Sequence, residues 1–230
     1  MNVLVACEES QEVCKAFRAK GHRAFSCDIQ ECSGGHPEWH IQDDVLRLIN
    51  GYKRGYGTPF FVTNDGKTHD TPERWDLIIA HPPCTRLCSS GQRWLYYGSE
   101  EYREQKRKDQ ENAIKFFLAF TVADADRIAI ENPIGIMSKL YRKPDCIYNP
   151  YDFAGETECK KTCLWLKGLP ELRPTEIIEE HIPYVSSGSY SKTHDPKYKG
   201  ASRKGGSAKT RAKTFPGIAR AMADQWGCLS

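Results

Sequence analysis

The sequence lacks the features that mark a membrane or secreted protein. None of its 230 residues fall in a run of 18 apolar residues, so we expect no membrane span. The N-terminus, Met-Asn-Val-Leu-Val-Ala-Cys-Glu-Glu, has no basic leader and no cleavage site, which favours a cytoplasmic protein. Internal repeats are also absent. With 39% hydrophobic and 27% charged residues, the chain has the composition of one globular domain, or one domain with a small appendage.

The cysteines lack the spacing of a metal-binding or disulfide framework. There are ten, irregularly placed, and no Cys-x2-Cys pair occurs. In a chain of this length we expect reduced thiols and predict no bound metal. Two Cys-x3-Cys pairs, Cys84/Cys88 and Cys159/Cys163, leave a structural zinc ion open as an alternative.

Short apolar runs alternate with helical periodicities along the chain. We predict strands at 3–7, 23–27, 76–80, 127–130 and 162–166, and a helix capped by Ser10 that ends near Gly21. Further helices are expected at 100–123 and 217–226, with a helical turn or short strand at 45–49. A polar insertion at about 51–74 contains a hairpin turn, Asn64-Asp65-Gly66. This alternation predicts an α/β fold: a twisted, mostly parallel sheet with helices on both faces.

Polar side chains follow three of these strands. Asp28 comes after the second strand, and the third stops at two prolines followed by Cys84, because proline cannot donate a ladder hydrogen bond. Glu131-Asn132 follows the next strand, before Pro133. Carboxyl ends of parallel strands meet at one edge of the sheet, where such folds bind ligands. Cys84 is therefore a candidate nucleophile, although a small buried thiol is the alternative.

Basic residues concentrate near the end of the chain. Residues 186–214 hold eight lysines and arginines and one acid, Asp195, in a stretch rich in glycine and serine. We expect an arm that contacts phosphates, with a solvated loop as the alternative.

Two motifs resemble the DNA (cytosine-5) methyltransferases. That family carries a Pro-Cys nucleophile after its fourth strand and a Glu-Asn dipeptide after its fifth, which Pro82-Pro83-Cys84 and Glu131-Asn132 match in order. The resemblance covers about residues 2–166, with a weaker echo at 214–226. Its other matches are Ser89-Ser90-Gly91 after the nucleophile, Lys20-Gly21 after the first helix, and Asp28. The compact layout resembles the small methylase-like proteins of phages and prophages.

The resemblance implies a Rossmann-like, S-adenosylmethionine-dependent methyltransferase fold and a methyl transfer to C5 of cytosine in DNA. Residues 1–170 would form the catalytic domain, and 171–230 a C-terminal segment with the basic arm and a closing helix. The Cys84 thiolate would add to C6 of the ring while Glu131 binds N3 and the amino group. The implied catalytic residues are Cys84, Glu131 and Asn132; the cofactor-binding residues are Cys7, Glu8, Glu9, Asp28, Asp44 and Pro82; the substrate-binding residues are Pro83, Ser89, Ser90, Arg93, Lys161, Lys204 and Arg211.

The chain also departs from the family pattern. The loop after the first strand, residues 7–12, has no glycine, the late Gln/Arg motif is missing, and no large target-recognition domain is present. Two alternatives therefore stay open: the same chemistry on a free cytosine mononucleotide (dCMP), and an inert Rossmann-like DNA-binding protein. Amino-methyltransferases fit less well, because His81 and Cys84 stand where they carry an Asp or Asn and an aromatic residue. Target sequence, strandedness and oligomeric state are not indicated.

Overall fold

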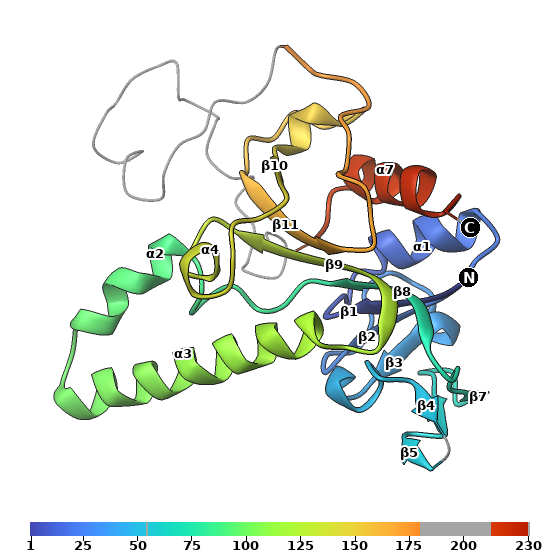
Figure 1. Cartoon of the computed structure of the whole chain (residues 1–230), viewed down its shortest axis with the longest axis horizontal. Coiled ribbons are helices and arrows are strands. Elements are labelled where there is room, and N and C mark those ends of the chain that lie inside the picture. Colours follow the sequence, from blue (N-terminus) through green and yellow to red (C-terminus); the bar gives the residue numbers. More distant parts are fainter. Residues whose placement is uncertain (54, 180–212, 230) are drawn as a thin grey trace.

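A seven-stranded sheet forms the centre of the computed structural model, which describes residues 1–53, 55–179 and 213–229 (Figure 1). Most of the predicted basic arm, including Lys204 and Arg211, lies outside these residues. The strand order is β10-β11-β9-β8-β1-β2-β3. The strands are β1 (Asn2–Ala6), β2 (Arg23–Asp28), β3 (His40–Gln42), β8 (Trp75–Ala80), β9 (Ala125–Pro133), β10 (Cys146–Tyr148) and β11 (Thr162–Lys167).

The order of strands reverses between β1 and β8. Strands β2 and β3 lie to one side of β1, and β8 and β9 to the other, and these five are parallel. Only β11 runs antiparallel to its neighbours β9 and β10. In open parallel sheets such a reversal leaves a crevice beyond the carboxyl ends of the strands. The predicted mostly parallel α/β sheet is therefore confirmed.

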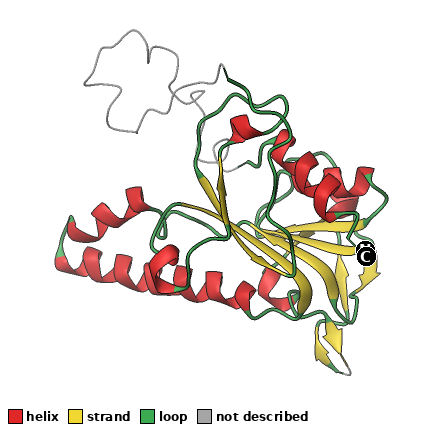
Figure 2. Ribbon diagram, turned by 45° about the horizontal axis from the view of Figure 1, so that its top comes forward, coloured by secondary structure: helices red, strands yellow, loops and turns green. Residues whose placement is uncertain are grey.

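Helices cover both faces of the sheet (Figure 2). Val3 and Val5 of β1 pack with α1 (Glu12–Ala19) and α7 (Pro216–Trp226), whereas Leu4 and Ala6 face the side covered by α3 (Glu100–Thr121). This alternation follows from the twofold periodicity of a strand. The charged first half of α3 extends beyond the sheet beside α2 (Ser89–Gln92), as Figure 1 shows. The remaining short helices are α4 (Met137–Leu140), η1 (Pro37–Trp39), η2 (Val45–Arg47), η3 (Arg93–Tyr96) and η4 (Pro150–Asp152).

The prediction that a strand ends at Ile130 is wrong. Strand β9 continues through Glu131 and Asn132 to Pro133, because β11 pairs with this extension from the other side. Pro133 occupies the last position, where the missing N–H costs little. Conversely, Cys7 lies just past β1 and not in it.

The polar insertion forms two small hairpins. The pair β4 (Tyr52–Lys53) and β5 (Tyr56–Gly57) precedes the pair β6 (Phe60–Val62) and β7 (Thr68–Asp70). The predicted turn at Asn64-Asp65-Gly66 joins β6 to β7, and Gly66 has the positive φ of 84° that such turns require. Within the described residues, no helix has the length and apolarity needed to span a membrane.

Helix α7 covers one side of the core, and burial of its Trp226 should contribute much to the stability of the protein. The indole is fully buried, and its Nε1 donates to the Pro170 carbonyl at 3.1 Å. We expect Trp226→Ala to lower the free energy of unfolding by about 3–5 kcal/mol, measured by urea denaturation. Tyr56→Ala is the control, since Tyr56 is 83% exposed; it should change stability by less than about 0.5 kcal/mol. Equal losses for both variants would contradict the assigned core.

Candidate active site

The ends of β8 and β9 meet at the carboxyl edge of the sheet. Ala80 is the last residue of β8 and pairs with Ile130, so β9 runs three residues further. There the Asn132 side chain donates from Nδ2 to the Pro82 carbonyl at 2.7 Å. Its Oδ1 is buried and has no hydrogen-bond partner among the described residues. This contact ties the Cys84 loop to the strand that carries Glu131.

The Cys84 loop forms one helical turn against the segment after β9. The amides of Leu87 and Cys88 both donate to the Cys84 carbonyl at 2.9 Å. Cys88 forms a bridge with Gly135, and the Leu87 carbonyl accepts from the Ile136 amide at 2.9 Å. A Cβ atom on Gly135 would lie 2.0 Å from the Leu87 oxygen, so only glycine fits. The two loops are thus held at backbone contact.

The Glu131 carboxylate accepts a hydrogen bond from His81 and is influenced by the charge of Lys160. Burial raises its pKa, but a hydrogen bond from His81 and the charge of Lys160 outweigh burial, and the pKa is lowered overall. His81 Nδ1 lies 3.2 Å from Glu131 Oε2, with the two side chains only 9% and 18% exposed. Glu131 therefore presents negative charge at the sheet edge.

The pKa of the Cys84 thiol is raised above its ordinary value. The hydrogen bond with Cys88 raises the pKa of Cys84 most, followed by burial and the negative charge of Glu131. The Lys160 ammonium acts in the opposite direction. Cys84 and Glu131 thus lie within electrostatic reach of each other and of one lysine.

A small crevice lies at the reversal point, between the loops after β1, β2 and β8. It is lined by Cys7, Glu8, Glu9, Ser10, Asp28, Gln30, His81, Lys213 and Thr214. Cys7 and Gln11 adopt φ angles of 60° and 61°, a left-handed backbone that normally favours glycine. Burial, then Asp28 and, more weakly, Asp44, raise the pKa of Cys7, which places both acids near it. Four of the predicted cofactor-binding residues therefore line one crevice, with Asp44 close by.

Glu8 has a structural role at the start of α1. Its two carboxylate oxygens accept the amides of Val13 at 2.6 Å and Cys14 at 3.1 Å. Burial raises the pKa of Glu8 to about 7, against the lowering effects of His81 and of these two amides. The carboxyl group is thus aimed at the helix and not into open solvent.

The predicted substrate-binding residues differ in their burial and contacts. Pro82 is buried against Asn132, Pro83 is exposed, and the Ser89 hydroxyl donates to the Ile134 carbonyl at 3.1 Å. Lys161 is exposed, and it is its neighbour Lys160 whose charge reaches the site. The side chains of Ser90 and Arg93, and all of Lys204 and Arg211, lie outside the described part of the chain.

The sequence reasoning missed the roles of His81 and Lys160. The only sequence signal for His81 is its position directly before the two prolines, which fixes it at the end of β8. All ten cysteines are free thiols. Within residues 1–53, 55–179 and 213–229, no three His, Cys, Asp or Glu side chains gather as a metal site.

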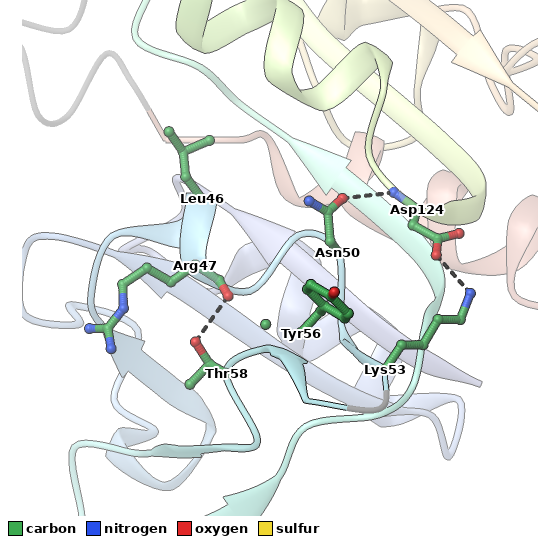
Figure 3. A pocket seen from close by; sticks show the side chains of 8 residues that line it. Leu46, Arg47, Asn50, Lys53, Tyr56, Thr58 and Asp124 are labelled. Atoms are coloured by element: carbon green, nitrogen blue, oxygen red, sulfur yellow. Dashed lines mark hydrogen bonds and ion pairs between the residues drawn. The ribbon is translucent and has the colours of Figure 1, made fainter.

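A larger cavity lies at the opposite edge of the sheet (Figure 3). It has a volume of about 580 Å³ and lies beside Asp124, which precedes β9. Two of its side chains contact Asp124: Lys53 pairs with its carboxylate at 2.8 Å, and Asn50 accepts a hydrogen bond from its amide. The side chains that carry the candidate chemistry are all at the other edge, so we assign this cavity no role.

Comparison with known proteins adds little. No protein-family model and no curated protein matches the chain. Among solved structures, it is similar to a prophage-encoded protein of E. coli provisionally described as a DNA modification methyltransferase, with 16% identity and a TM-score of 0.42. The match covers 77% of this chain and 52% of the other, so the chain spans about half the length of that structure. The fold assignment therefore rests on the strand topology.

Replacing Gly135 should separate the two loops of the site. In Gly135→Ala the added methyl group would press on the Leu87 carbonyl, and we expect a loss of about 1–3 kcal/mol in unfolding free energy. Faster alkylation of Cys84, followed by mass spectrometry, should accompany it. Ser89→Ala removes one hydrogen bond between the same loops without adding bulk, and should cost about 0.5–1 kcal/mol. A Gly135→Ala protein as stable as the wild type would rule out the close contact.

Glu8 should make stability fall with rising pH. Its pKa is about 7 in the folded state and 4.5 in the reference state, so the folded protein binds the proton more tightly. This contribution is complete below pH 4.5 and disappears as pH rises to about 7, a total of about 3 kcal/mol.

The test compares the wild type with Glu8→Gln, which keeps one acceptor oxygen but does not titrate. Urea denaturation between pH 4.5 and 8 should show the wild type losing about 3 kcal/mol relative to the variant. Parallel stability curves for the two proteins would show that Glu8 does not take up a proton in this range.

Proposed function

We propose that the protein is an S-adenosylmethionine-dependent methyltransferase that acts on C5 of cytosine in DNA through a covalent Cys84 adduct. One observation carries the proposal: Cys84 lies in the loop after β8, and Glu131 lies near the end of the adjacent parallel strand β9, at the same carboxyl edge of the sheet. The hydrogen bond from Asn132 to Pro82 ties the Cys84 loop to this strand. A thiol and a carboxylate in this relation suit a ring that is attacked at one carbon and held by a nitrogen edge.

The chain's own residues divide the chemistry between them. Cys84 adds through sulfur to C6 of the ring once its proton is lost, helped by Lys160. One Glu131 oxygen accepts from His81, which leaves the other to accept from the exocyclic amino group of cytosine. Because Glu131 is held in place in a buried site, it fixes the orientation of the ring while the thiolate adds to it. Asn132 holds the loop, and its buried Oδ1 is a free acceptor for substrate.

The crevice beside Cys7 fits a cationic nucleoside cofactor in its chemistry. Asp28 stands at the carboxyl end of β2, a common position for an acid that binds ribose hydroxyls. Within the described residues only Gln30 donates to it, through Oδ1, so Oδ2 is left for a ligand. Glu9 and Asp44 add negative charge nearby. S-adenosylmethionine, when bound, supplies an electrophilic methyl group and a positive charge on sulfur.

DNA is the preferred substrate because of the basic segment at 186–214. Its last two residues, Lys213 and Thr214, line the crevice, so the segment ends at the site. Lys204 and Arg211 would contact phosphates and offset the few kcal/mol needed to flip a base out of the duplex.

The test offers three substrates with methyl-labelled S-adenosylmethionine: duplex DNA, single-stranded DNA and dCMP. We expect label in duplex DNA, recovered as 5-methylcytosine by mass spectrometry of nucleosides. Cys84→Ser should reduce transfer by at least about 10³-fold, since the covalent route is lost. Cys228→Ser changes an exposed cysteine far along the chain and should leave transfer unchanged.

Other outcomes assign the alternatives. Label in dCMP alone would transfer the proposal to the free nucleotide. Methyl groups on an exocyclic nitrogen, or full turnover by Cys84→Ser, would refute C5 chemistry. Salt-sensitive DNA binding without cofactor binding would favour the inert DNA-binding protein.

A further inference from the structure

The sheet holds His81 in place at the site. It directly follows β8, and its amide donates to the Ala6 carbonyl at 2.9 Å, which extends the β1–β8 ladder by one step. Pro82 comes next and fixes the backbone on the other side. The imidazole is nearly buried, with 9% of the side chain exposed. Its position therefore depends on the sheet and not on a free loop.

Glu131 fixes which nitrogen of His81 carries the proton. An ionised carboxylate only accepts hydrogen bonds, so Nδ1, at 3.2 Å from Glu131 Oε2, is the donor. In the neutral imidazole the other nitrogen, Nε2, then has a free lone pair. This is the arrangement by which a carboxylate orients a histidine for proton abstraction.

His81 Nε2 has nothing to bond within the described residues. The atom is buried, and no hydrogen-bond partner for it is present there. Leaving a buried polar atom unpaired is unfavourable, and such atoms point to a ligand or a catalytic role. The ring also lines the crevice with Cys7 and Glu8, while its Nδ1 faces the Glu131 side. His81 thus lies between the proposed cofactor crevice and the proposed cytosine site.

We propose that His81 is the general base that removes the C5 proton after methyl transfer. This inference rests on the proposed function, in which the methylated ring carries both a C5–H bond and an Sγ–C6 bond. The C5–H bond breaks and its proton moves to Nε2. Its electron pair forms the C5=C6 double bond, the Sγ–C6 bond breaks, and Cys84 leaves as a thiolate. The imidazolium, stabilised by Glu131, later returns the proton to water.

Loss of this base should stall the reaction at a defined point. In His81→Asn the amide nitrogen can still donate to Glu131, so addition and methyl transfer remain possible while the acceptor at Nε2 is lost. We expect a burst of about one methyl group per protein, an SDS-stable covalent complex with duplex DNA, and turnover reduced about 10²-fold. The complex should contain Cys84 and a methylated cytosine, identified by mass spectrometry.

The controls separate a missing base from a damaged fold. His69→Asn removes a histidine from the β6–β7 hairpin and should turn over like the wild type without accumulating the complex. His81→Ala with added imidazole should release the stalled complex, because a small base can enter the vacated space. Turnover of His81→Asn at the wild-type rate, or a slow variant that shows no burst and no complex, would overturn the role of His81.

Wild-type protein with DNA containing 5-fluorocytosine tests the proposed function by itself. Fluorine cannot leave as a proton does, so the wild type should form the stable complex on this DNA. If it does and His81→Asn still turns over normally on cytosine, only the present inference fails. If the wild type forms no complex at all, the proposed function fails and this inference with it.

The protonation of His81 can be measured without any reaction. In ¹⁵N-histidine-labelled protein at pH 8, NMR should find the neutral His81 proton on Nδ1, with Nε2 unprotonated. Glu131→Gln should shift the proton toward Nε2, because an amide is a weaker acceptor than a carboxylate. A proton found on Nε2 in the wild type would contradict the inference.

Discussion

The unequal length of two adjacent strands creates the site. Strand β9 outruns β8, and its extension is stable only because antiparallel β11 supplies hydrogen bonds on the far side. The side of β9 that β8 leaves uncovered is filled by the turn from His81 to Cys84. Asn132 donates a side-chain hydrogen bond to the Pro82 carbonyl at that edge, in place of the backbone hydrogen bond that a longer β8 would form. This hydrogen bond holds the turn from His81 to Cys84 against the end of β9.

Charged groups at this edge set one another's pKa values. Glu131 is buried yet ionised, because His81 and Lys160 offset the desolvation of its carboxylate. Glu8 is buried without comparable compensation, and its pKa rises to about 7. The imidazole between them therefore faces one fixed charge and one that titrates near neutrality. The hydrogen bond with Cys88, burial and the charge of Glu131 raise the pKa of Cys84, whereas the charge of Lys160 lowers it.

The sequence predicts the centre of the fold well and its details less well. Runs such as Leu77-Ile78-Ile79 are buried on both faces and have an unmistakable composition, whereas β3 and β10 have three residues each and show no periodicity. The end of β9 is mispredicted because a proline stop is a local signal, while the pairing that overrides it comes from β11. The predicted meeting of Cys84 and Glu131 at one edge follows from strand direction alone. The contact between His81 and Glu131 spans 50 residues and depends on register, which composition does not encode.

Cys7 and Gln11, in the loop between β1 and α1, have a left-handed backbone although neither is glycine. Glycine would adopt these φ angles freely, but side-chain-bearing residues pay roughly 1 kcal/mol each, so surrounding contacts must hold them. Gln11 is locked by His36 on both amide atoms, and Gly34 lies too close to Gln11 to carry a Cβ. The glycine needed for close packing here is Gly34, in the facing loop, and not a residue of the loop after β1. A search for glycines after the first strand would pass over this chain, although Cys7 and Gln11 there adopt the left-handed backbone that glycine favours.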